Sequence, residues 1–341
     1  MTRTTPPRPA DIAAAFPELV PLARTATRLH PRPGSPSPRD SSVGGPLLWP
    51  AHEPWPHCDG PHWASDLLPA RSPADVRQLR RLEEAARTGL PHTPQEQAEM
   101  ARIKAGHPTP TGPIAMLALA QLYVHDVPVL RPPGEADLLQ VLWCPFDHGE
   151  QNMPRTELLW RSATEVTDVL TPTPEPDAVQ YGDYLPEPCH VDPEQIVEYP
   201  AAAELEEELR RRVTEWSTRQ TAGAGPGGLY DGAQELFYHH ELSLAPGWKA
   251  GGWTPWSVTD FHPQYCTVCR SRMEPMLTVA SYEWQPDGPS WIPYEDRAAA
   301  ASPTVYPTLA NPTRISLAGG YNQQLYACPA SPEHPHAALL Q

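Results

Sequence analysis

Residues 251–276 read GGWTPWSVTDFHPQYCTVCRSRMEPM and combine a Gly-Gly pair, two tryptophans and a Cys-x-x-Cys motif. A similar order stands earlier in the chain, at residues 44–58, which read GGPLLWPAHEPWPHC and keep one cysteine. Two stretches with glycines, tryptophans and a cysteine in the same order predict that one structural unit occurs twice.

Further landmarks extend the repeat. Met116-Leu117 and Cys144-Pro145 accompany the first stretch, and Met276-Leu277 and Cys328-Pro329 accompany the second. SPAD at 72–75 and TPQE at 93–96 are typical helix starts, and both lie between Cys58 and Met116. We therefore predict an α+β fold that is internally duplicated, with two sheet-rich halves packed as one pseudo-symmetric body and a helical hairpin inserted in the first half. Runs of apolar or alternating residues predict strands at 114–124, 136–144, 276–284 and 314–328.

Composition divides the chain into four parts. A stretch rich in proline and serine at 30–42 predicts a linker, and the charged run ELEEELRRRVTEW at 204–216 predicts a helix. The predicted parts are an N-terminal helical segment and linker (1–40), a first repeat with an insertion at about 72–105 (41–150), a connecting segment with the charged helix (151–245) and a second repeat (246–341).

The overall composition limits the partners. The 341 residues carry a formal net charge of −16, which disfavours binding to nucleic acid. The N-terminus has no uninterrupted apolar segment of the kind found in signal peptides, and no apolar run is long enough to span a membrane. We expect a cytoplasmic protein, in which the six cysteines stay reduced.

Cysteines and histidines form two candidate metal sites. Cys266 and Cys269 would place two thiolates on one turn, and Cys328 with His334 or His336 would complete a tetrahedral site. The first half offers a weaker set without a Cys-x-x-Cys: Cys58, His62, Cys144 and His148. The expected metal is a structural Zn²⁺ in either case. The alternative is that these cysteines are simply buried as small apolar residues.

Tryptophans surround both Gly-Gly pairs. Trp49, Trp55, Trp253 and Trp256 would form a groove for a protein partner if they were exposed, because tryptophan is frequent at binding hot spots. The alternative is that they fill the core of a protein that has only four phenylalanines.

The sequence contains no complete catalytic motif, so we expect no catalytic residue. Glu274 is the acid nearest to the Cys-x-x-Cys motif, and MEPM predicts a turn around it. A zinc-dependent hydrolase that uses the second-half cysteines is the competing interpretation, and a role in defence or immunity is a third.

The halves resemble the YwqG-like bacterial family, a domain family of unknown function. The stretches that carry this resemblance are GGPLLWP, MLALAQL, LLQVLWCP, GGWTPW, CTVCRSRMEPML and LYACP. The family is more distantly similar to the programmed-cell-death-2 proteins, which look like dedicated chaperones for a newly made ribosomal protein. The resemblance implies a duplicated, mostly sheet fold. Together with the acidic charge, it favours a non-enzymatic cytosolic protein-interaction module, chaperone-like for a basic client.

Overall fold

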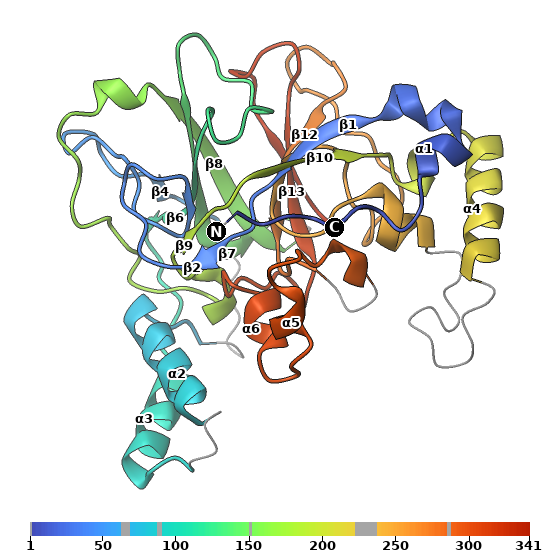
Figure 1. Ribbon diagram of the computed structural model, residues 1–341. Helices are drawn as coiled ribbons and strands as arrows, with labels where there is room; N and C mark the ends of the chain where they lie inside the picture. The colour runs from blue at the N-terminus through green and yellow to red at the C-terminus, as the bar shows by residue number, and fades with distance from the viewer. Residues whose placement is uncertain (1, 63–68, 87–90, 150–151, 222–236, 285–287) are drawn as a thin grey trace.

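Two antiparallel sheets of six strands each form the centre of this computed structural model (Figure 1). The structure describes residues 2–62, 69–86, 91–149, 152–221, 237–284 and 288–341. Helices and antiparallel sheets occur together, which confirms the predicted α+β class.

The first sheet has the strand order β2-β9-β3-β6-β7-β8. Its strands are β2 (Arg32–Pro33), β9 (Cys189–His190), β3 (Ser42–Val43), β6 (Leu117–Tyr123), β7 (Leu138–His148) and β8 (Met153–Arg161), and a separate two-stranded ladder joins β4 (His57–Cys58) to β5 (Ile114–Ala115). Strand β7 is buried along almost its whole length, as its apolar sequence requires. The strand contains one side-chain amide, that of Gln140. Its nitrogen donates hydrogen bonds to the Leu48 carbonyl and to the Gln121 side chain, so the buried amide nitrogen has partners.

The second sheet has the strand order β10-β1-β11-β12-β13-β14. Its strands are β10 (Glu194–Glu198), β1 (Arg24–Arg28), β11 (Lys249–Gly251), β12 (Glu274–Ala280), β13 (Asn322–Ala327) and β14 (Ala337–Leu340). All four predicted strands therefore exist, with shifted ends. The largest shift is in β13, which begins at Asn322, eight residues after its predicted start. Strand β7 continues through Pro145, because its pairing with β8 is irregular between Trp143 and Asp147 and the missing N–H of a proline breaks no regular hydrogen bond there.

Two chain segments cross from one sheet to the other. The segment with β1 and β2 runs beside the segment with β9 and β10, so that β1 pairs with β10 and β2 with β9. At the crossing point the Asp192 N–H donates to the Leu29 carbonyl at 2.7 Å. The predicted boundaries at residues 40, 150 and 245 therefore do not coincide with the two sheets, because each sheet includes strands from outside its predicted repeat.

One apolar core belongs to both sheets. A single cluster of buried side chains includes Leu119 and Val141 of the first sheet and Leu277 and Val279 of the second. Trp143 extends this core and donates its indole N–H to the Tyr184 carbonyl. The sheets are therefore packed together by shared apolar burial, the dominant favourable term in folding.

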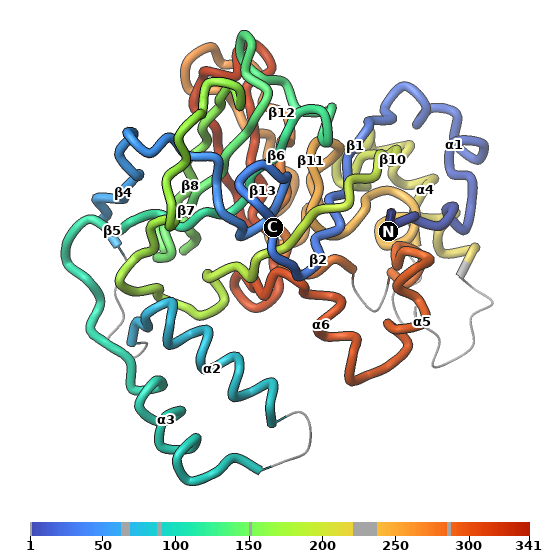
Figure 2. The backbone as a smooth tube through the Cα atoms, turned by 60° about the vertical axis from the view of Figure 1, so that its left-hand side comes forward, coloured from blue at the N-terminus to red at the C-terminus, as the bar shows by residue number. Residues whose placement is uncertain are grey.

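The inserted hairpin consists of α2 (Pro73–Ala86) and α3 (Pro94–Ala105), which Figures 1 and 2 show projecting away from the sheets. Thr93 and Glu96 form a capping box at the start of α3, as the TPQE stretch predicts. The Ser72 hydroxyl accepts a hydrogen bond from the Asp75 N–H at the start of α2.

A second group of helices packs around one apolar cluster beside the second sheet. It consists of α1 (Ile12–Ala15), the 3-10 helix Pro17–Leu22, α4 (Glu207–Thr221) and the π-helix Tyr238–Ser243. The described residues also contain α5 (Arg297–Ala300), α6 (Tyr306–Ala310) and short 3-10 helices at Ala163–Glu165, Gly182–Tyr184, Ala202–Glu204 and Pro289–Trp291. Phe16 meets Trp216 edge-to-face, which joins the N-terminal helices to α4 (Figure 1). In the predicted N-terminal helical segment and linker (1–40), helix is therefore present only at Ile12–Ala15 and Pro17–Leu22, and residues 24–28 form strand β1. Within the described residues, no helix has the length and apolar character that crossing a membrane requires.

Candidate metal centres and the adjoining cleft

The fold brings Cys266, Cys269, Cys328 and His334 together, and these four residues are here called the C-terminal cluster. Strand pairing explains this arrangement. Because Glu274 of β12 pairs with Ala327 of β13, the Cys-x-x-Cys turn before β12 lies beside the cysteine that follows β13. The turn is closed by hydrogen bonds from the Cys266 N–H to the Ser271 carbonyl and from the Arg270 N–H to the Cys266 carbonyl.

The distances within the C-terminal cluster match a tetrahedral metal site. His334 Nδ1 lies 3.5 Å from Cys266 Sγ and 3.3 Å from Cys328 Sγ. Cys269 Sγ lies 3.4 Å from Cys328 Sγ. A zinc ion with bonds of about 2.3 Å to sulfur and 2.0 Å to nitrogen separates its ligand atoms by roughly 3.3–3.8 Å. His336, the alternative fourth residue, instead lies 2.8 Å from the Thr156 hydroxyl.

The exposure of the C-terminal cluster is uneven. Cys266 and Cys328 are buried, whereas Cys269 is exposed. Hydrogen bonding to Ser271, whose hydroxyl lies 3.3 Å from the Cys269 sulfur, lowers the pKa of Cys269 to about 6. Cys269 is therefore largely a thiolate at neutral pH, which is the form that binds a metal.

The second group, here called the N-terminal cluster, consists of Cys58, His62, Cys144 and His148. Cys144 and His148 both belong to β7 and are four positions apart, a spacing that places side chains on one face of a strand. Cys58 ends β4, which is held beside the start of β6 by the β4–β5 ladder and by a hydrogen bond from the Met116 N–H to the Pro56 carbonyl.

The N-terminal cluster is more buried and contains an unpartnered donor atom. Cys58 Sγ lies 3.7 Å from His148 Nε2. The Nε2 atom of His62 is buried and has no hydrogen-bond partner. One ring nitrogen of His62 lies within 4.8 Å of the other three candidate ligand atoms. Burial lowers the pKa of His148 to about 4, so this imidazole is neutral at pH 7 and keeps a lone pair for a metal. Burial also raises the pKa of Cys144, and a bound cation would reverse that effect.

Both clusters therefore consist of four nitrogen and sulfur donors at metal-binding separations and could hold a metal ion. The structure brings together eight of the nine residues that the sequence suggested, including the set predicted as weaker, and leaves out His336. Ser271 was not anticipated, although a hydroxyl two positions after the second cysteine was visible in CTVCRS.

The predicted tryptophan groove does not form. Trp49 and Trp55 are buried and contact each other with tilted rings, and Trp253 is also buried. Each of these three indole N–H groups donates to a backbone carbonyl inside the protein. Trp256 is half-buried and donates to the Glu204 carboxylate. These side chains were available to fill the core because the chain contains so few phenylalanines.

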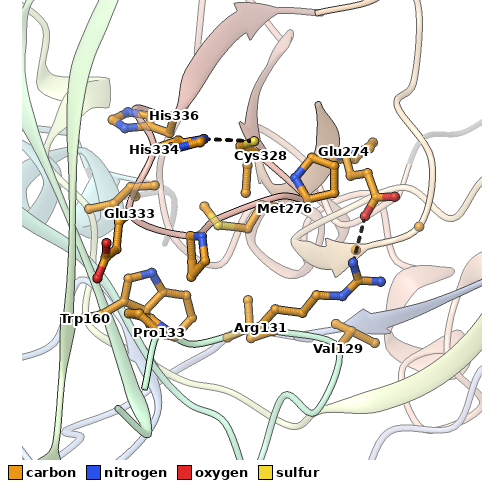
Figure 3. A pocket seen from close by; sticks show the side chains of 18 of the residues that line it. Val129, Arg131, Pro133, Trp160, Glu274, Met276, Cys328, Glu333, His334 and His336 are labelled. Atoms are coloured by element: carbon orange, nitrogen blue, oxygen red, sulfur yellow. Dashed lines mark hydrogen bonds and ion pairs between the residues drawn. The ribbon is translucent and has the colours of Figure 1, made fainter. Parts of the chain in front are cut away.

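A cleft of about 790 Å³ lies next to the C-terminal cluster (Figure 3). One side consists of Val129, Leu158 and Trp160 from the first sheet and its loop. The other side consists of Met276 and the loop at 328–336, which includes two residues of the C-terminal cluster.

The rim of the cleft carries paired charges. Arg131 Nη1 lies 3.3 Å from Glu274 Oε2, as the dashed line in Figure 3 marks. Glu274 is the first residue of β12 and not part of a turn, so the predicted position of this acid was wrong. Its carboxylate is engaged by an arginine and belongs to neither metal cluster.

Comparison with known proteins gives no match to any family model and none to the curated protein sequences.

Proposed function

We propose that this chain is a non-enzymatic protein-binding module of the cytoplasm, in which each Cys/His cluster holds one structural zinc ion and the cleft receives an extended segment of a basic client. The observation that carries this proposal is the composition of the cleft. Its walls come from both sheets, and one wall is a loop that begins at Cys328 and includes His334. A metal at this cluster would therefore fix the shape of the binding surface.

Zinc is the metal that suits these donors best. Thiolate and imidazole ligands in sets of four are typical of structural zinc sites, whereas carboxylate and carbonyl oxygens are preferred by magnesium and calcium. Neither cluster includes a carboxylate. In a reducing cytoplasm the six cysteines, all of them free thiols in the structure, would remain available as ligands.

A hydrolase is disfavoured by the same donor sets. A catalytic zinc keeps one position for water or substrate, and a general base stands nearby. Each cluster here already supplies four donors, and Glu274 is paired with Arg131.

The client is inferred from the chemistry of the cleft and of the whole chain. The apolar side chains of Val129, Leu158, Trp160 and Met276 suit apolar residues of an extended segment. The net charge of −16 attracts a basic protein over long range and speeds the encounter. Keeping such a segment covered before it reaches its final partner is a chaperone-like activity.

We further propose that duplication of an ancestral unit produced both clusters. Each sheet contains four neighbouring antiparallel strands in chain order, β3-β6-β7-β8 and β11-β12-β13-β14, which would be the two copies. Cys144 lies within β7, and Cys328 follows the equivalent strand β13. An experimental structure in which the four-strand units and the two clusters superpose would support duplication, and units of different connectivity would contradict it.

Affinity capture with mass spectrometry tests the proposed function. The intact chain is expected to retain a basic protein in near-stoichiometric amount. Val129→Arg, which places a charge in the cleft, should abolish capture of that protein. Val197→Arg is the matched control, because Val197 is 55% exposed and lies outside the cleft. Equal capture by both variants, or turnover by the purified protein in a hydrolase panel, would contradict the proposal.

A further inference from the structure

The two clusters differ in how easily an oxidant could reach their sulfur atoms. Cys58 is 4% and Cys144 is 0% exposed, so both thiols of the N-terminal cluster are sealed in the protein. In the C-terminal cluster, Cys269 is exposed. A thiol that solvent reaches is more open to oxidation than one that is buried. Among these cysteines, Cys269 is therefore where a dissolved oxidant would react first.

A second thiol lies within reach of Cys269. Its sulfur is 3.4 Å from that of Cys328, and a disulfide requires about 2.05 Å, so closing the bond takes a movement of about 1.4 Å. Cys269 lies on a short turn whose neighbour Arg270 has a φ of +63°, and Cys328 begins the loop that leads to β14. Both sulfurs thus belong to loop segments outside the strands, which can accommodate such a movement.

We propose that Cys269 and Cys328 form an oxidation-sensitive pair, which responds to hydroperoxides by forming a disulfide and releasing zinc from the C-terminal cluster alone. This proposal rests on the proposed zinc site. The Cys269 thiolate attacks the distal peroxide oxygen, the O–O bond breaks, and the other oxygen leaves as water after protonation. The sulfenic acid formed on Cys269 is then attacked by the Cys328 thiolate, which forms the S–S bond and expels a second water after protonation. In total, two thiolates, one hydrogen peroxide and two protons give one disulfide and two waters.

Release of the metal would reach the cleft. The disulfide removes two of the four donors and leaves Cys266 and His334, which are too few to hold zinc tightly. The loop at 328–336 then loses its attachment through His334, and this loop forms one wall of the cleft (Figure 3). Oxidation is therefore expected to loosen the wall that contacts a client while the N-terminal cluster keeps its metal.

Titration with hydrogen peroxide tests the pair. Zinc-loaded protein is treated with increasing peroxide, released zinc is measured with a chromogenic chelator, and disulfides are mapped by non-reducing peptide mass spectrometry. We expect about half of the bound zinc to be released, together with a Cys269–Cys328 disulfide. Cys58→Ser is the matched variant, because it removes the N-terminal zinc but should leave the peroxide-dependent release unchanged in amount.

The outcomes separate this inference from the proposed function. Zinc bound in both clusters but released equally from both, or a disulfide between Cys266 and Cys269, would overturn the inference and leave the zinc proposal standing. A protein that binds no zinc would contradict the proposed function and the zinc release proposed here, and the disulfide map would then decide only whether Cys269 and Cys328 are an oxidation-sensitive pair. In that case, absence of the Cys269–Cys328 bond after peroxide treatment would overturn it.

Discussion

His334 Nδ1 lies 3.3 Å from the sulfur of Cys328, six positions earlier, so one loop contributes two of the four donors of the C-terminal cluster. The same loop contains His336, whose Nε2 faces the Thr156 hydroxyl instead. The same short segment thus contains His334, a candidate metal ligand, and His336, which is outside the cluster and serves as a matched control.

Substitution of these two histidines should separate ligand from neighbour. His334→Gln is expected to reduce bound zinc by about one ion per chain, because only one cluster loses a donor. His336→Gln should retain all of it, since glutamine can keep a hydrogen bond to Thr156. Zinc content by mass spectrometry of purified variants gives the answer. Equal loss in both variants would show that His334 has no special role.

Substitution of a buried cysteine in the N-terminal cluster should lower the stability more than substitution of the exposed cysteine in the C-terminal cluster. Cys144→Ser and Cys269→Ser should each release about one zinc, but Cys144 is fully buried among apolar side chains. Its replacement by serine also buries a hydroxyl, which adds about 1–3 kcal/mol if the hydroxyl is unpaired. We therefore expect the lower melting temperature for Cys144→Ser by calorimetry. A lower value for Cys269→Ser would contradict the assignment.

Chelation should destabilise the native protein. A zinc ion that binds only the folded state contributes about 4 kcal/mol when free zinc is a thousandfold above the dissociation constant. A strong chelator should therefore lower the melting temperature of the intact chain. A variant with both Cys58→Ser and Cys328→Ser should melt at the same temperature with and without chelator. An unchanged melting temperature in the intact chain would argue against metal in either cluster.

The buried histidine His30 should make stability depend on pH. Burial lowers the pKa of His30 to about 4, from 6.5 for an ordinary histidine. Between these values the unfolded chain binds a proton that the folded chain does not, so stability falls as the pH falls from about 6.5 to 4, by up to about 3 kcal/mol. His30→Gln keeps a donor for Glu194 and removes this loss. Urea unfolding of the native protein and of His30→Gln at several pH values checks this prediction. The same dependence of the free energy of unfolding on pH in both proteins would refute it.

A buried ion pair in the second sheet should contribute strongly to stability. Lys249 Nζ lies 2.6 Å from Glu198 Oε1, and both side chains are fully buried. Lys249→Met should cost about 3–5 kcal/mol, because it leaves the Glu198 charge buried without its cation. Arg211→Met, which breaks exposed pairs with Glu208 and Glu215 on α4, should leave the stability nearly unchanged. Similar costs in chemical denaturation would contradict this difference.

The sequence predicted the candidate metal residues better than it predicted the boundaries. Spacing alone paired Cys58 with His62 and Cys144 with His148, because residues four apart on a strand or within one turn can share a site. Strand β1 was missed because RTATR at 24–28 contains two arginines, and only the fold shows that Arg28 is buried, with hydrogen bonds to Thr5, Trp291 and Glu283.

The tryptophans show a second limit of sequence. Trp49 and Trp55 stand beside prolines in a stretch that could equally be an exposed loop. Their burial depends on Cys144 and Phe146 of β7, residues about ninety positions away in the chain. The cleft likewise combines loops and strands from both sheets, which no local pattern brings together.

Elemental analysis of the purified chain is the most direct test of the central claim. Protein expressed with added zinc and purified without chelators should contain about two zinc ions per chain, one for each cluster, with little iron or copper. Less than about 0.2 zinc per chain under these conditions would contradict the account, since closed sets of four thiolate and imidazole donors hold zinc tightly.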